Sequence, residues 1–215
     1  MKLIVGLLLA SLLAAAYVMG SGVYNMAATE KHWTITEKII EWVRINSITA
    51  HSKDLEIPVM SASSDFDYVT IGAKHYDAMC TACHLAPGQA TTELAQGLYP
   101  QAPVFHQRIP LTSQEDSQEQ IKAYFWVIKN GIKMTAMPAW GITHDDNVIW
   151  AMALFVQDLA GMSTDRYHEL TSKNGSDRDV KHDHEHVNHQ HGHAQQTEHD
   201  NHIDHMHHHD KAPFE

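Results

Sequence analysis

The only two cysteines of this 215-residue chain lie three positions apart, and a histidine directly follows the second. These residues are Cys80, Cys83 and His84. Two thiols at this spacing can each form a thioether bond to one porphyrin, and the adjacent imidazole can ligate its iron. The pattern therefore predicts one covalently attached c-type haem, with Cys80 and Cys83 as the attachment points and His84 as the proximal axial ligand.

Two other chemistries also use paired cysteines. A thioredoxin-like thiol pair requires a βαβ setting, and a zinc site requires two further soft ligands close by. Neither context is visible around Cys80 and Cys83. The sequence favours haem.

Helices must position this motif. Gly72 and Tyr76, four residues apart on one face of an expected helix, precede it. A second helix is expected over residues 145–159, where Val148, Met152 and Phe155 form an apolar stripe with Trp150 and Leu154 beside it. Because a glycine allows close approach, we expect this second helix to cross the first at Gly72.

A third helix is expected over residues 113–130. Ile121, Phe125 and Ile128 recur at helical spacing, and Gly131 follows as a C-cap. The three helices together predict one compact domain at residues 64–165.

Residues 72–160 resemble a class I cytochrome c, in which a helix with a glycine and an aromatic residue precedes the haem motif and crosses a C-terminal helix. The resemblance implies an all-α fold around one covalent haem c. It also implies a methionine as the distal axial ligand, and Met137, followed by Pro138, stands 53 residues after His84. Ala136 departs from the glycine that relatives often have before this ligand. Met137 could instead be a core methionine, and Met134 lies only three residues away.

Ligation by His84 and Met137 would leave no open position on the iron. The resemblance and this ligand set imply electron transfer between redox proteins, with no catalysis and no small-molecule substrate. The domain could be a free carrier or the cytochrome subunit of a dehydrogenase or oxidase complex. Tyr99, Phe105 and Trp140 could line the haem pocket or simply fill the core.

The N-terminal run from Leu3 to Val23 carries no charge and is long enough to cross a bilayer. Its small residues at 14–16 would also suit a cleaved signal peptide. Because the run continues to Tyr24, an interfacial aromatic residue, we expect residues 1–24 to be an uncleaved anchor. The expected location is a bacterial inner membrane, single-pass, with the haem domain in the periplasm.

Residues 25–63 should connect the anchor to the domain. Residues 32–48 predict an amphipathic helix with a capping box from Thr34 to Glu37. Its apolar positions are Ile35, Ile39, Trp42 and Val43. The membrane surface or the haem domain could cover this face; a connecting helix that packs on the domain is the expectation. An extended linker should follow.

Residues 166–215 are predicted to be a disordered tail, because twelve of the chain's nineteen histidines fall within 182–209 among very few apolar residues. Imidazoles and carboxylates suit copper, zinc or nickel. An appended tag could explain only the last cluster. The candidate metal ligands are His182, His184, His186, His189, His191, His193, His207, His208 and His209. A metal-binding protein with an accessory haem is thus an alternative function.

The formal net charge is −11. Residues 64–165 contain eleven acidic and five basic residues, a net charge of −6. No basic patch is present to bind nucleic acid. An acidic haem domain instead favours a redox partner with a basic docking face.

Overall fold

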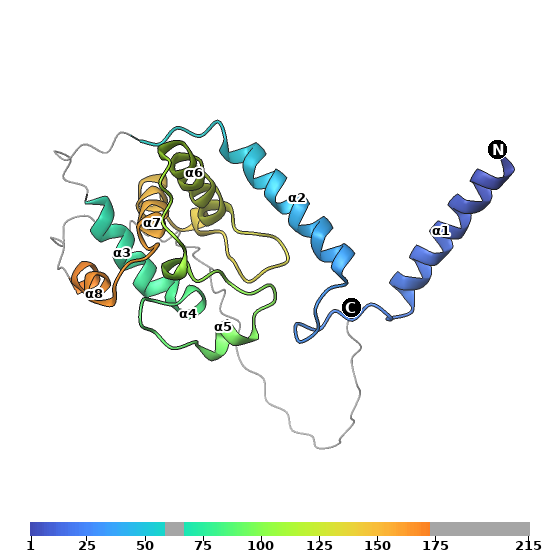
Figure 1. Ribbon diagram of the computed structural model, residues 1–215, viewed down its shortest axis with the longest axis horizontal. Coiled ribbons are helices and arrows are strands. Elements are labelled where there is room, and N and C mark those ends of the chain that lie inside the picture. Colours follow the sequence, from blue (N-terminus) through green and yellow to red (C-terminus); the bar gives the residue numbers. More distant parts are fainter. Residues whose placement is uncertain (59–66, 173–215) are drawn as a thin grey trace, which may run out of the picture. The chain divides into compact units, whose positions relative to one another are not determined.

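The computed structural model describes residues 1–58 and 67–172, and these ranges contain helices and no strand. The predicted all-α fold is confirmed for this part of the chain. In chain order (Figure 1) the elements are α1 (Lys2–Gly20), α2 (Thr34–Ser52), α3 (Tyr68–Met79), α4 (Thr81–His84), α5 (Glu93–Gly97), the 3-10 turn η1 (Phe105–Gln107), α6 (Gln114–Asn130), the 3-10 turn η2 (Trp140–Ile142), α7 (Asp146–Asp158) and α8 (Thr164–Ser172).

The core is built where α3 and α6 both pack against α7 (Figure 1). Gly72 of α3 lies directly on α7. A Cβ atom at Gly72 would stand 2.7 Å from the Cβ of Phe155 and 2.8 Å from the carbonyl carbon of Ala151. The close crossing predicted at Gly72 is therefore confirmed, and it requires the absence of a side chain there.

Helix α7 is buried on more than one side because it lies between two other helices. Met152 and Phe155, predicted to face inward, are almost completely buried, and so are Ile149 and Val156. Asp145 is the N-cap of the helix, and its carboxylate accepts hydrogen bonds from the backbone N–H groups of Asn147 and Val148. The buried face of α7 therefore includes the predicted apolar stripe but is wider than that stripe.

Helix α6 follows its sequence prediction closely. The hydroxyl of Ser113 caps its first turn by accepting a hydrogen bond from the N–H of Asp116. Phe125 and Ile128 are buried against the core, and Ile121 packs at its edge. Gly131 ends the helix with a φ of 66°, a backbone conformation that favours glycine.

The start predicted for the tail was wrong, because Thr164–Ser172 form α8. Tyr167 and Leu170 of α8 are only 2% and 3% exposed. The Tyr167 hydroxyl donates a 2.7 Å hydrogen bond to the carboxylate of Asp77 on α3. Two apolar side chains on one face suffice to dock this otherwise polar helix, so the packed region extends through Ser172.

Three expectations for residues 25–63 need correction. Trp33 occupies the N-cap of α2 without a side-chain hydrogen bond, so Thr34 is already helical and no capping box forms. The apolar face is not covered by the domain, as Ile39 and Trp42 are 54% and 68% exposed. The linker begins later than expected, because α2 continues through Ser52 and the following residues Leu55 and Ile57 pack against the core.

Helix α1 has no buried residue. By length and composition it could cross a membrane, and a signal sequence would pass the same test. The helix ends at Gly20, where the N–H of Ser21 bonds to the carbonyl of Tyr17, three residues before the end of the uncharged run.

Candidate haem site

The two cysteines and the histidine lie on a single turn at the end of α3. Cys80 is both the C-cap of α3 and the N-cap of α4, and Cys83 and His84 belong to α4. The N–H of His84 donates a 2.8 Å hydrogen bond to the carbonyl of Cys80. The turn thus holds the three side chains predicted to bind haem together on one rigid segment.

The chemistry of the thiols argues against a redox-active pair. Cys80 and Cys83 form no disulfide, and both are half-buried. Burial raises the pKa of the Cys80 thiol to about 12, with a further contribution from Cys83. A thioredoxin-like cysteine instead needs a lowered pKa to supply thiolate at neutral pH. A zinc site has no support either, because the described residues contain no cluster of three or more histidine, cysteine, aspartate or glutamate side chains.

The ring of His84 is fixed by two contacts from the segment between α5 and α6. Nδ1 lies 2.9 Å from the carbonyl oxygen of Pro103. Since a carbonyl only accepts, Nδ1 carries the proton and Nε2 keeps its lone pair. Phe105 stacks on the imidazole, with ring centroids 4.8 Å apart and planes inclined by 24°.

The pKa of His84 is lowered, chiefly by burial, against the raising effect of the Pro103 hydrogen bond. The positive charge of Arg108 lowers it further. Arg108 is held over the ring of Phe105, 5.0 Å from its centroid. The environment therefore favours the neutral imidazole, which is the form that ligates a metal.

Tyr76 connects the turn of Cys80, Cys83 and His84 to the core of the domain. It is 1% exposed, and its hydroxyl donates a 2.9 Å hydrogen bond to the carbonyl of Leu85, which follows His84. Its ring also packs on Phe155 of α7. Burial raises the pKa of the Tyr76 hydroxyl above its usual range, so it remains a donor at physiological pH. The predicted aromatic residue before the motif thus links the haem turn to the core.

Met137 lies on the loop between α6 and η2, in a different environment from Met134. Met137 is half-buried and packs against the core cluster, whereas Met134 is 87% exposed. The Met137 N–H bonds to the hydroxyl of Thr135, and its carbonyl accepts from the N–H of Ile132. A Cβ atom at Gly131 would stand 2.8 Å from the Met137 carbonyl oxygen. The loop is therefore held by close backbone contacts around Met137, whereas the Met134 side chain projects into solvent.

The three candidate pocket residues have different positions. Phe105 lies on His84, as described above. Trp140 packs at the edge of the core and meets His144 edge-on. Tyr99 instead contacts the segment before α2, where its hydroxyl accepts a 3.0 Å hydrogen bond from the N–H of His32.

Residues 68–156 match the family model described as "Cytochrome C oxidase, cbb3-type, subunit III". With the turn geometry above, this match shows that the chain contains a cytochrome c domain, and the resemblance to class I mono-haem cytochromes is confirmed. The match covers α3 through most of α7 and includes Cys80, Cys83, His84 and Met137. No similar curated protein and no similar solved structure was found.

A cytochrome c domain implies haem c, and the donor set fits it. Two unpaired thiols and an imidazole whose Nδ1 is bonded to the Pro103 carbonyl share one turn, and a half-buried thioether lies on a constrained loop. These are the groups that covalent attachment and axial ligation of haem iron require.

Two groups that act on His84 could not be found from the sequence: the carbonyl of Pro103, which accepts a hydrogen bond from Nδ1, and the guanidinium of Arg108, whose charge lowers the pKa of His84. Neither belongs to a motif, since one acts through its backbone and the other through a charge brought near by folding. The candidate ligands from His182 to His209 lie outside the described residues.

Proposed function

We propose that this protein is a membrane-anchored, extracytoplasmic c-type cytochrome that carries single electrons between respiratory proteins. The observation that carries the proposal is the turn at the end of α3, where two unpaired thiols precede an imidazole whose Nδ1 is already bonded to the Pro103 carbonyl. Haem c, when bound, supplies an iron that changes between two oxidation states by one electron.

In this proposal Cys80 and Cys83 hold the haem covalently, and His84 and Met137 are the axial ligands. The hydrogen bond to Pro103 orients the imidazole of His84 and increases its basicity. Met137 is preferred to Met134 because its side chain packs on the core rather than in solvent. A neutral sulfur ligand favours reduced iron, so this pair sets a higher potential than two histidines would.

The anchor in this proposal is α1, which would keep the cytochrome at the outer face of a bacterial inner membrane. Its support is the length and apolar composition of Lys2–Gly20. The acidic character of the domain favours partners with basic docking faces.

A second candidate is a role as the cytochrome subunit of an oxidase complex. The observation favouring it is the description of the matching family, which names a subunit of cbb3-type cytochrome oxidase. The haem site would be the same in both cases. Co-purification from solubilised membranes would separate them, since a stoichiometric oxidase partner is expected only for a subunit.

The metal-binding alternative rests on the sequence of the tail alone. It proposes copper, zinc or nickel on the histidines of residues 182–209, in addition to the haem.

Redox titration and ligand binding test the carrier proposal together. The purified protein should titrate as one centre exchanging one electron, and its reduced form should not bind carbon monoxide, because both axial positions are occupied. Rapid carbon monoxide binding by the folded protein would contradict a carrier with two protein ligands.

A further inference from the structure

Helix α2 presents an apolar stripe made of Ile35, Ile39, Trp42 and Val43. These residues follow one another at i, i+4, i+7 and i+8 and therefore lie on one side of the helix. All four are more than half exposed, from 52% to 68%. Nothing in the described part of the chain covers them.

The haem domain contacts the other side of α2. Ile48 is half-buried and stands nine residues after Ile39, which is about two and a half helical turns and so the opposite side of the helix. The ring of His51 packs on Trp126 of α6. The domain thus contacts the C-terminal end of α2, beyond the stripe, and at Ile48 it lies on the side opposite Ile39.

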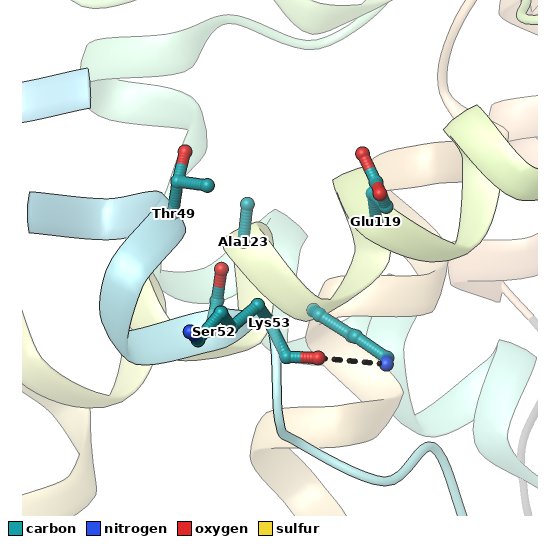
Figure 2. A pocket seen from close by; sticks show the side chains of 6 residues that line it. Thr49, Ser52, Lys53, Glu119 and Ala123 are labelled. Atoms are coloured by element: carbon teal, nitrogen blue, oxygen red, sulfur yellow. Dashed lines mark hydrogen bonds between the residues drawn. The ribbon is translucent and has the colours of Figure 1, made fainter. Parts of the chain in front are cut away.

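The C-terminal end of α2 is fastened to α6. Lys122 donates a 3.1 Å hydrogen bond to the carbonyl of Lys53, drawn as a dashed line in Figure 2. Its positive charge also complements the negative end of the helix dipole. Thr49 and Ser52 from α2 and Glu119 and Ala123 from α6 line a small pocket at this junction (Figure 2). This end of α2 is therefore joined to the domain by direct contacts.

The N-terminal end of α2 is fastened close to α1. The hydroxyl of Tyr24 lies 2.7 Å from Nδ1 of His32, and the Tyr24 ring meets Trp33 edge-on at 4.9 Å between centroids. Tyr24 is only four residues after Gly20, a span of at most about 14 Å. Because Tyr24 contacts His32 and Trp33 directly, the start of α2 lies closer to the end of α1 than the length of the connecting segment would require.

We propose that the apolar stripe of α2 lies in the lipid interface of the membrane that α1 crosses. This inference rests on the proposed anchoring by α1. The short tether places α2 near the membrane surface, and an amphipathic helix there buries its apolar face about 5–10 Å into the headgroup boundary. Tyr24, Trp33 and Trp42 are aromatic residues of the kind enriched at that depth.

The charges of α2 favour lipid contact by apolar burial rather than by attraction to anionic headgroups. Glu37 and Glu41 are balanced by Lys38 and Arg44. Because the helix is fastened to the haem domain at one end and to the anchor segment at the other, lipid contact would fix the orientation of the domain at the membrane. The domain would then offer the same face to every partner.

Spin labels on full-length, haem-loaded protein in phosphatidylcholine nanodiscs test this inference. Ile39→Cys and Glu37→Cys are a matched pair, since both positions are exposed and two residues apart on opposite sides of α2. For each label, the change in relaxation on adding oxygen is compared with the change on adding water-soluble chromium oxalate. Val43→Cys and Glu41→Cys provide a second such pair, and the haem spectrum reports folding of every variant.

The inference predicts that the label at Ile39 is reached by oxygen and shielded from chromium oxalate, with an accessibility ratio several-fold above that at Glu37. Similar access of chromium oxalate to both labels would place the stripe in water and overturn the inference. A label at Ile39 that is immobilised and shielded from both reagents would mean that protein, such as a second copy, covers the stripe, which also overturns it.

Two controls separate this result from the proposed function. If Cys80 and Cys83 carry haem, each variant has one titratable thiol, and three thiols would instead mean that the haem assignment failed. N-terminal sequencing of the same preparation tests the anchor, because a mature start after residue 20 would remove α1. Either failure is visible independently of the label at Ile39.

Discussion

Nδ1 of His84 lies 2.9 Å from the carbonyl oxygen of Pro103, a residue 19 positions further along the chain. This hydrogen bond decides the tautomer of the imidazole and leaves the lone pair on Nε2, the atom proposed to ligate the iron. It also ties the haem turn to the segment that carries Phe105. The orientation of the imidazole proposed as the proximal ligand is therefore set by a distant part of the chain.

Replacement of the proposed distal ligand should change the iron spectrum selectively. In Met137→Ala, the weak sulfur-to-iron charge-transfer band of the oxidised protein should disappear and the midpoint potential should fall, because a soft neutral ligand is lost. Absorption spectroscopy and redox titration measure both effects. Met134→Ala is the matched control and should behave as the parent protein, since Met134 is 87% exposed. Loss of the band in Met134→Ala alone would reverse the assignment.

The crossing of α3 and α7 should not tolerate a methyl group at Gly72. Gly72→Ala would place a carbon atom 2.7 Å from the Cβ of Phe155, and overpacking of this kind costs about 1–3 kcal/mol of stability. Chemical denaturation of the haem-loaded protein measures the loss. Gly97→Ala is the control, because no atom lies within 4 Å of the added carbon, and it should change stability little. Equal stability of the two variants would argue against the close crossing.

Helix α8 should belong to the stable domain. A protein that ends at Ser163 would lose the buried side chains of Tyr167 and Leu170, each worth about 1.5–3 kcal/mol. A protein that ends at Lys173 keeps both and should match the full-length chain in thermal unfolding followed by circular dichroism. If the shorter protein is as stable as the longer one, α8 contributes nothing to the fold.

The tail should bind divalent metals without affecting the haem. Copper(II) should bind more tightly than zinc, and binding should weaken as pH falls through about 6.5, where free imidazole gains a proton. Calorimetric titration of the full-length chain and of the protein ending at Lys173, at two pH values, measures this. Equal metal uptake by the two proteins would refute a metal-binding tail, and slower haem reduction in the shorter one would refute its independence from the haem.

The sequence was most informative where chemistry or close packing dictates a residue. The spacing of Cys80, Cys83 and His84 indicated a cytochrome c domain, which the family match confirms, and the close crossing of α3 and α7 requires Gly72, so both features could be predicted. Cap positions depend on where a helix actually begins. Because Trp33 occupies the N-cap of α2, Thr34 could not act as one.

Contacts between distant segments could not be predicted in the same way. The bond between His32 and Tyr99 joins residues 67 positions apart, and no local pattern marks it. Helix α8 did carry a signal, Tyr167 and Leu170 three positions apart, but two apolar residues in a polar segment are too few to predict a docked helix. The exposure of the α2 stripe likewise depends on which side of the helix the domain occupies.

Covalent attachment of haem is the property on which the proposed function depends. The protein expressed with haem maturation machinery should keep peroxidase-active haem through a denaturing gel, and its mass should equal that of the chain plus one haem. Replacement of both Cys80 and Cys83 by serine should abolish this attachment. Haem that separates from the parent protein under denaturant, or that stays attached to the double variant, would mean that Cys80 and Cys83 do not hold haem covalently.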